Sequence, residues 1–329
     1  MDKRNRAIPK AKKGPPRGSK SKKSSWKKSS RTLAWISLFL VCVLGSLSLG
    51  SNYFDKEVLG VNDFSYPVKI ASYPKIKEPE PVISAASYAV VDFDSGVMLA
   101  EKNSRIKMFP ASLTKLMTAL VAMEYFHLDD VLTVKNLVKQ EDEADMGLEV
   151  GDQLTVRNLL YGLLVPSGND AAYVLADNYP GGLPAFVSAM NQKARELHMN
   201  QSHFVNPSGI DDSFHYSSVS DLVLLARSVL QNSEISKIVS TKSVVLSDIT
   251  GRKKYYTYTV NQLLGFAGID GIKTGFTDFA GQCLILSAKK NDHRIITVVL
   301  KSADRFTESL KLVNWVFNSV TWLSSVAPI

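Results

Sequence analysis

Cysteine and histidine are both scarce in this chain of 329 residues. The two cysteines are Cys42, inside an apolar run, and Cys283, inside a predicted core strand, so we expect no disulfide. No His-x-x-x-His pair of the zinc-binding kind occurs among the five histidines, which are His127, His198, His203, His215 and His293. The sequence therefore argues against a disulfide framework and a metal-dependent hydrolase, and we expect neither a metal ion nor a cofactor.

Positive charge is concentrated at one end of the chain. Residues 1–31 hold 13 of the 39 Lys and Arg but only one of the 31 Asp and Glu, so the remaining sequence has 26 basic and 30 acidic side chains, a net charge of −4. The basic leader has no Arg–aromatic clusters, and positive charge beside a membrane span orients that span and attracts anionic lipid. We therefore predict no nucleic-acid partner.

Residues 32–54 contain no charged side chain. A helix of this length would span about 34 Å, enough to cross a bilayer. With the basic leader before it, the segment predicts a single-pass anchor in the cell membrane, with a cytoplasmic N-terminus and everything after residue 54 outside. A cleaved signal peptide is the alternative, because 46–48 and 48–50 offer small-x-small sites. The long leader favours the retained anchor, and the orientation is the same in both cases.

The rest of the chain predicts one α+β domain at 86–322, between a proline-containing linker at 55–85 and a short tail at 323–329. Helices are expected from Ser112, over 156–164, from Asp170 and over 304–320. Strands are expected over 88–92, 97–100, 269–275, 283–288 and 294–300. This order indicates an antiparallel sheet built from both chain ends and flanked by helices, with an inserted helical subdomain. The active site is expected at their junction.

Three short motifs occur in a fixed order, and they are Ser112-Leu113-Thr114-Lys115, Ser167-Gly168-Asn169 and Lys273-Thr274-Gly275. Each has an ordinary explanation by itself, as a helix N-cap, a turn or an edge strand. Ser-x-x-Lys also recurs elsewhere, but only the copy at Ser112 opens an apolar helical pattern. The three motifs together predict nucleophilic catalysis by a serine.

The residue types fit that chemistry. Lys115, three residues after Ser112, lies on the same helix face and can take the serine proton, while Lys273 as a second cation disfavours its ammonium form. Ser167 is expected to relay a proton to the leaving nitrogen, and Asn169 to bond a substrate amide.

The strand motif is expected to bind the end of the substrate. Lys273 and Thr274 would hold a terminal carboxylate, and Gly275 would leave room for a peptide beside the strand. The backbone N–H groups of Ser112 and Phe276 would form the oxyanion hole.

Longer segments around these motifs resemble the D-alanyl-D-alanine carboxypeptidases, a family of low-molecular-weight penicillin-binding proteins. The resemblance covers about 85–322 and includes F-P-A-S-L-T-K-L-M-T-A-L, M-G-L-E-V-G-D, L-V-P-S-G-N-D-A-A, F-V-N-P-S-G-I-D-D and D-G-I-K-T-G-F-T-D. It implies a β-lactamase/transpeptidase-like fold and removal of the terminal D-Ala from peptidoglycan stem pentapeptides through an acyl-serine. It also implies that β-lactams inhibit the protein by acylating Ser112. Many members carry a C-terminal β-rich domain and membrane helix, and we expect the N-terminal span to replace that anchor.

Three alternatives stay open at this point. A DD-endopeptidase of the same family would cut cross-links, and loops near 141–146 and 211–216 would then open the groove to a second strand. A β-lactamase would need a Glu that activates water, and the Glu-x-x-x-Asn spacing of Glu196 and Asn200 is interpreted as a helix end instead. A non-catalytic penicillin-binding or sensor module is disfavoured because all catalytic positions are intact.

Overall fold

The computed structural model describes residues 75–137 and 144–322. All of them belong to one unit, Lys69–Ile329. The predicted leader, anchor and tail, and most of the predicted linker, lie outside the described residues. Within the described ranges, no helix is both long enough and apolar enough to cross a bilayer.

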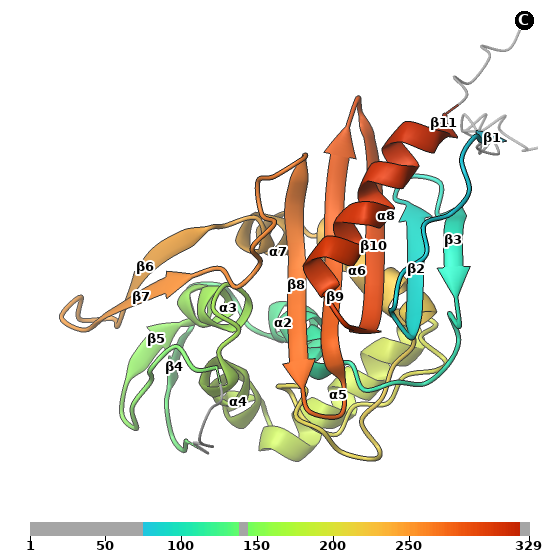
Figure 1. Ribbon diagram of the computed structural model, residues 1–329. Coiled ribbons are helices and arrows are strands. Elements are labelled where there is room, and N and C mark those ends of the chain that lie inside the picture. The colour runs from blue at the N-terminus through green and yellow to red at the C-terminus, as the bar shows by residue number, and fades with distance from the viewer. Residues whose placement is uncertain (1–74, 138–143, 323–329) are drawn as a thin grey trace, which may run out of the picture. The chain divides into compact units, whose positions relative to one another are not determined.

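A five-stranded antiparallel sheet in the order β3-β2-β10-β9-β8 forms the centre of the domain (Figure 1). Its strands are β2 (Ser87–Asp92), β3 (Met98–Lys102), β8 (Ile269–Thr277), β9 (Gly281–Lys290) and β10 (His293–Ser302). β10 pairs with β2 on one side and with β9 on the other. The central strands are rich in buried Val, Ile and Leu because helices cover both faces of the sheet. The predicted antiparallel sheet made from both chain ends is confirmed.

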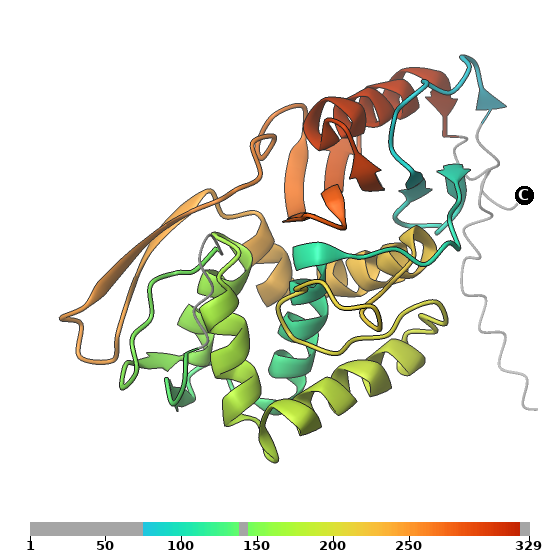
Figure 2. The same cartoon turned by 60° about the horizontal axis from the view of Figure 1, so that its bottom comes forward.

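Helices form a layer on each face of this sheet. One face is covered by α8 (Arg305–Ser319), which packs on β9 and β10, and the other by α6 (Val219–Gln231), which packs on β2 and β10 (Figures 1 and 2). Between β3 and β8 the chain builds a helical region around α2 (Lys115–Tyr125). Its other helices are α3 (Val156–Leu164), α4 (Asn169–Asn178), α5 (Gly182–Glu196) and α7 (Ser233–Val239). The first eight residues of α2 are buried, which makes it the centre of the helical region.

Two small two-stranded sheets accompany the helical region and are not predicted by the sequence patterns. One pairs β4 (Val131–Thr133) with β5 (Gln153–Thr155), and the other pairs β6 (Ser243–Ser247) with β7 (Lys254–Tyr258). Strands of three residues are too short to display an alternating pattern. The β6–β7 hairpin projects beside the edge strand β8 (Figure 2).

The predicted linker, 55–85, overlaps the folded unit at its C-terminal end, which corrects the predicted boundary. β1 (Lys75–Ile76) pairs with β11 (Val320–Thr321) just after α8. Ile83 and Ala85 are buried in the core on the α8 side of the sheet. The cause is apolar burial, which a proline count alone does not reveal.

Candidate active site

Ser112 lies in a tight turn that precedes the central helix. The turn is the 3₁₀ helix η1 (Ala111–Thr114), and the α-helix α2 begins at Lys115, so the helix predicted from Ser112 starts as a 3₁₀ turn and becomes α-helical three residues later. In a 3₁₀ turn, side chains three residues apart eclipse one another. The Lys115 Nζ therefore reaches the Ser112 Oγ directly, at 2.7 Å.

Lys115 is completely buried, although lysine is almost never found fully buried without partners. Its ammonium has three donors, and three acceptors surround it. Besides Ser112, it donates to the Asn169 Oδ1 at 2.5 Å and to the Ser208 carbonyl at 2.9 Å. These contacts hold the lysine beside the serine and connect the first two motifs.

Ser167 and Lys273 form a second hydroxyl–amine pair. The Lys273 Nζ donates to the Ser167 Oγ at 2.8 Å and to the Thr274 carbonyl at 2.9 Å. Ser167 has a left-handed backbone with φ of 72°, a conformation that costs energy for a non-glycine residue and is common at active sites. This conformation occurs in the loop between α3 and α4.

The Lys273 side chain is 1% exposed, and the pKa of its ammonium is well below the usual value. Burial is the largest cause, followed by repulsion from Lys115 and Arg305. Lys115 and Lys273 are therefore coupled, and the state in which both carry a proton is disfavoured.

The third motif, 273–275, lies on the edge strand β8, beside the Ser112 turn. A side chain on Gly275 would come within 3.1 Å of the Ala111 Cβ, 3.2 Å of the Pro110 carbonyl and 3.3 Å of the Ser112 nitrogen. The missing side chain thus faces the turn that carries the nucleophile. Gly275 therefore also allows the strand to approach the serine turn, a role that the sequence did not predict.

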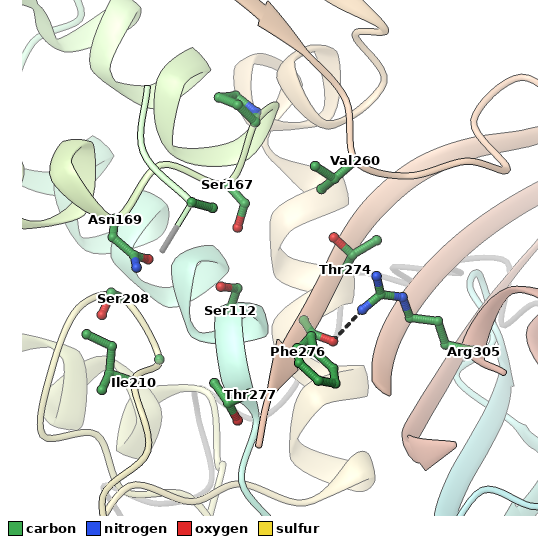
Figure 3. Close-up of a pocket in the computed structure, with 14 residues that line it drawn as sticks. Ser112, Ser167, Asn169, Ser208, Ile210, Val260, Thr274, Phe276, Thr277 and Arg305 are labelled. Carbon is green, nitrogen blue, oxygen red and sulfur yellow. Dashed lines mark hydrogen bonds between the residues drawn. The ribbon is translucent and has the colours of Figure 1, made fainter. Parts of the chain in front are cut away.

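A cleft of about 280 Å³ lies between β8 and the helical region (Figure 3). Among its lining residues are six of the eight predicted site residues, namely Ser112, Ser167, Asn169, Thr274, Gly275 and Phe276. The other two, Lys115 and Lys273, lie behind it, bonded to Ser112 and Ser167 respectively. All eight predicted residues are therefore brought to one place.

The cleft also contains residues that the motifs do not identify. Arg305, the first residue of α8, lines it and donates from Nη1 to the Gly275 carbonyl at 2.7 Å. Burial lowers the pKa of its guanidinium. Ser208 and Gly209 also line the cleft. They lie in the segment 204–212, which resembles the family but for which the sequence predicts no catalytic or binding role. Arg305 is isolated in sequence, so no pattern could have indicated it.

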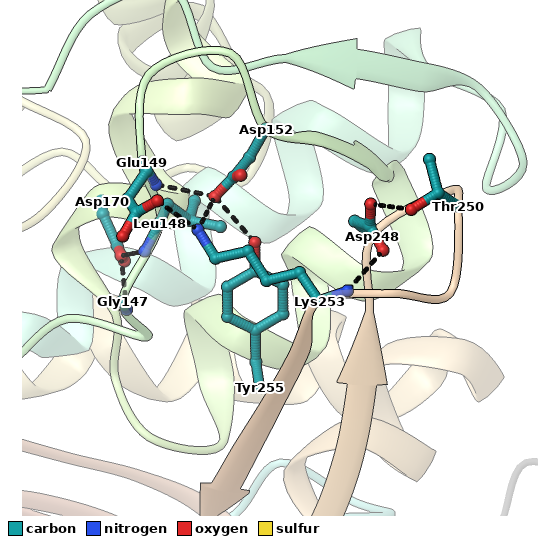
Figure 4. A network of polar contacts seen from close by, with 9 residues as sticks. All are labelled: Gly147, Leu148, Glu149, Asp152, Asp170, Asp248, Thr250, Lys253 and Tyr255. Atoms are coloured by element: carbon teal, nitrogen blue, oxygen red, sulfur yellow. Dashed lines mark hydrogen bonds and ion pairs between the residues drawn. The ribbon is translucent and has the colours of Figure 1, made fainter.

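A carboxylate fixes the loop that faces the Ser167 motif. Asp170 accepts hydrogen bonds from the backbone N–H groups of Met146, Gly147 and Leu148, each at 3.0 Å. Figure 4 shows the bonds from Gly147 and Leu148. In the opposite direction, the Asn169 N–H donates to the Ala144 carbonyl at 2.7 Å. Because Ala144 lines the cleft, these bonds join one wall of the cleft to the start of α4.

His215 is the histidine nearest to the catalytic turn. Its Nδ1 accepts a bond of 3.2 Å from the Val205 N–H, so we assign the proton to Nε2, which lies 2.8 Å from the Thr114 Oγ1. Burial lowers the pKa of His215 from 6.5 to about 4. It is a core histidine that fixes the loop 205–217 to the catalytic turn.

The β-lactamase alternative, which needs a glutamate at the reaction centre, finds no support in the cleft. Glu196 is the last residue of α5, as predicted, and its carboxylate contacts Lys193 and Gln192 rather than the cleft. Among residues 75–137 and 144–322, no group of three His, Cys, Asp or Glu side chains could hold a metal ion.

A buried serine–lysine pair, opposed by a second serine–lysine pair across a cleft between a sheet and a helical region, defines an active-site serine peptidase. The model of the D-alanyl-D-alanine carboxypeptidase family matches residues 74–304, and the chain belongs to this family.

Curated relatives and solved structures agree with this placement. The chain is 35% identical over 243 residues to D-alanyl-D-alanine carboxypeptidase DacF of Bacillus subtilis, a match covering 71% of this chain and 62% of that one. It is 36% identical to DacD of Escherichia coli, covering 71% and 63%. The Streptomyces K15 DD-transpeptidase crystal structure is similar with a TM-score of 0.69 and 31% identity, over 73% of this chain and 100% of that one. The chain spans slightly less than two thirds of the first two relatives.

Proposed function

We propose that this protein is a serine-type D-alanyl-D-alanine carboxypeptidase that removes the terminal D-Ala from peptidoglycan pentapeptides. The observation that carries the proposal is the pair of serine–lysine contacts, Ser112 with Lys115 and Ser167 with Lys273, joined across one cleft. Family membership supports the same reaction class.

In the acylation step, neutral Lys115 takes the proton from the Ser112 hydroxyl while the oxygen attacks the carbonyl carbon of the penultimate D-Ala. The repulsion between the two buried lysines favours the state in which one of them is neutral. The oxyanion that forms lies beside the backbone N–H groups of Ser112 and Phe276, at the place where β8 approaches the turn.

The leaving nitrogen then receives a proton from the Ser167 hydroxyl, which is replenished by Lys273 at 2.8 Å. Free D-Ala leaves, and the proton that Lys115 took from Ser112 passes to Lys273, which leaves Lys115 neutral again. A water then attacks the acyl-serine and gives a proton to Lys115, and this proton moves to the Ser112 oxygen as the ester bond breaks and the shortened peptide departs.

Recognition of the substrate terminus is assigned to the cationic end of the cleft. Thr274 and Arg305 line that end, and Lys273 lies directly behind it. A substrate that ends in a carboxylate places its negative charge beside the Arg305 guanidinium there. A peptide whose chain continues through an amide has no negative charge at that position. Asn169, held at Lys115, is positioned to bond a substrate amide. β-Lactams, which carry a carboxylate beside a reactive amide, fit the same groups and acylate Ser112.

For the location of the protein, we propose a single-pass anchor over 32–54, with a cytoplasmic N-terminus and an extracytoplasmic catalytic domain. The charge distribution of residues 1–54 supports this orientation. A reporter active only outside the cytoplasm, fused after residue 60, should be active, and a reporter active only in the cytoplasm should be silent at the same position. The reverse result would refute this topology.

The reaction is tested by incubating the full chain in detergent with diacetyl-Lys-D-Ala-D-Ala and, separately, with fluorescent penicillin. We expect release of D-Ala and a stable label, and loss of both in Ser112→Ala. Lys115→Ala should lose acylation while keeping the wild-type thermal midpoint within a few degrees. A label of normal intensity on Ser112→Ala would contradict the assignment. Cleavage of cross-linked dimers without release of D-Ala would identify an endopeptidase, and rapid penicillin turnover a β-lactamase.

A further inference from the structure

The β6–β7 hairpin presents an aromatic ridge to solvent. Side chains of β7 alternate, so that Tyr255 and Thr257 are buried while Lys254, Tyr256 and Tyr258 are exposed. Tyr256 is 67% exposed and Tyr258 66% exposed, although large aromatic side chains dominate cores and interfaces. We define the aromatic ridge as Lys254, Tyr256 and Tyr258, together with the cross-strand neighbour Val245.

The pairing register leaves both tyrosine rings of this ridge uncovered. Tyr256 lies opposite Val245, which is itself 55% exposed, and Tyr258 lies opposite Ser243. Neither cross-strand neighbour is large enough to cover a phenol ring. The outer face of the hairpin therefore offers two accessible aromatic rings about 7 Å apart, with an ammonium group at its outer end.

The inner face of the same hairpin is firmly held. The Tyr255 hydroxyl donates to the Asp152 Oδ2 at 2.7 Å, and the Lys253 Nζ donates to the same oxygen at 2.6 Å (Figure 4). Tyr255 and Leu246 belong to the main core. An isolated two-stranded hairpin is marginal in water, so these contacts are what fix the orientation of the ridge.

The ridge lies close to the catalytic cleft along the chain. Val260, two residues after Tyr258, lines the cleft together with Ser167 and Thr274 (Figure 3). From Lys254 to Tyr258 the ridge spans about 13 Å. A dipeptide in the cleft does not reach it, whereas a stem of four extended residues spans up to about 14 Å and brings whatever is attached to its other end into range.

We propose that the aromatic ridge is a docking surface for the glycan strand of peptidoglycan, to which the stem peptide in the cleft is attached. This inference rests on the proposed function. Sugar rings present flat C–H faces that stack on exposed aromatic rings, and sugar hydroxyls can bond the phenol oxygens. Lys254 matches the carboxylates that the polymer carries.

Other occupants fit the ridge less well. Two tyrosines supply at most about 500 Å² of contact, short of the roughly 800 Å² per partner that a stable dimer buries. A lipid surface would call for more exposed apolar area beside the basic groups than this ridge has. In addition, β1 and β11, at the two ends of the described chain, lie toward the opposite edge of the sheet (Figure 1).

The test compares wild type with a Tyr256→Ala/Tyr258→Ala double variant and with Tyr125→Ala, which removes a half-exposed tyrosine from the end of α2. D-Ala release is measured from three substrates, which are diacetyl-Lys-D-Ala-D-Ala, a free pentapeptide, and uncross-linked glycan strands that carry the same pentapeptide. Binding to purified sacculi is measured by sedimentation in a Ser112→Ala background.

We expect the double variant to remain within twofold of wild type on both free peptides. On glycan strands its kcat/KM should fall about tenfold, mainly through KM, and its sedimentation with sacculi should weaken by a similar factor. Tyr125→Ala should match wild type in both assays. If wild type releases D-Ala from none of the three substrates, the proposed function is refuted. The sedimentation assay would still test whether the ridge binds the glycan.

Several results would overturn the inference. An equal loss of kcat/KM on the free pentapeptide would show that the ridge binds the peptide. Unchanged affinity of the double variant for sacculi would show that the ridge does not bind the glycan. Variant-sensitive binding to phosphatidylglycerol vesicles without binding to sacculi would indicate a membrane surface. A dimer that dissociates in the double variant would identify a second copy as the occupant.

Discussion

Acid is expected to destabilise this domain through one buried histidine, His215. Its ring is 1% exposed, and burial lowers its pKa from 6.5 to about 4. The second proton of the ring would go to Nδ1, the nitrogen that accepts the hydrogen bond from the Val205 N–H. The cation would therefore lose this bond as well as its hydration. The folded state therefore resists the proton that the unfolded chain accepts.

The size and sign of the effect follow from these two values. Between pH 6.5 and 4 the unfolded state binds more protons, so the free energy of unfolding decreases as the pH falls through this window. At pH 4.5, relative to pH 7.5, His215 alone should lower the free energy of unfolding by about 2.5 kcal/mol. This is a large part of the stability of an ordinary domain.

The assay is urea unfolding of wild type, His215→Gln and His127→Gln at pH 7.5 and pH 4.5. Glutamine keeps a donor for Thr114 but does not titrate, so the decrease in stability between the two pH values should be about 2.5 kcal/mol smaller in His215→Gln. All other titrating groups cancel in this difference. His127→Gln, which removes an exposed histidine from the loop after α2, should keep the wild-type decrease. Equal decreases in all three proteins would refute the reasoning.

Three further predictions concern other parts of the structure. Arg305→Gln should lower kcat/KM for D-Ala-D-Ala peptides by about 10- to 100-fold while affecting a C-terminal amide analogue less, because a charged partner of the carboxylate is lost; steady-state kinetics on both peptides decides this. Gly209→Ala should lower the thermal midpoint by about 5–10 °C in calorimetry, because φ is 91° and the new Cβ would lie 1.9 Å from the Ala111 carbonyl oxygen. Tyr255→Phe should lower the free energy of unfolding in urea by about 1 kcal/mol through loss of the bond to Asp152, and an unchanged midpoint would show that this bond contributes nothing.

Much of the sheet could be predicted because its strands are long and apolar. β9 and β10 each have ten residues with a continuous buried centre, and their pattern identifies them without tertiary information. The β6–β7 hairpin could not be predicted in this way, because its outer face carries tyrosines where alternation would place polar residues. Its position depends on contacts with Asp152, about 100 residues earlier.

The site shows the same division. Ser112, Lys115, Ser167 and Lys273 occur in local motifs, so their types and spacings carry the chemistry before any fold is known. Arg305 reaches the cleft only because α8 packs on the sheet beside β8. A single residue with no local companions becomes visible only when the fold brings it to its neighbours.

The pairing of β10 with β2 has a consequence for the synthesis of the chain. The paired residues Ile295 and Asp92 are about 200 positions apart, and a ribosome adding about 5–20 residues per second would take roughly 10–40 s to cover that distance. During this time β2 and β3 have an unpaired edge and an uncovered apolar face. Lys273 is also synthesised long after Ser112. A nascent chain therefore contains the nucleophile before it contains β8, the strand that forms the other side of the cleft. Catalytic competence is therefore delayed until β8, β9 and β10 have been synthesised, and the early strands need shielding from aggregation until then.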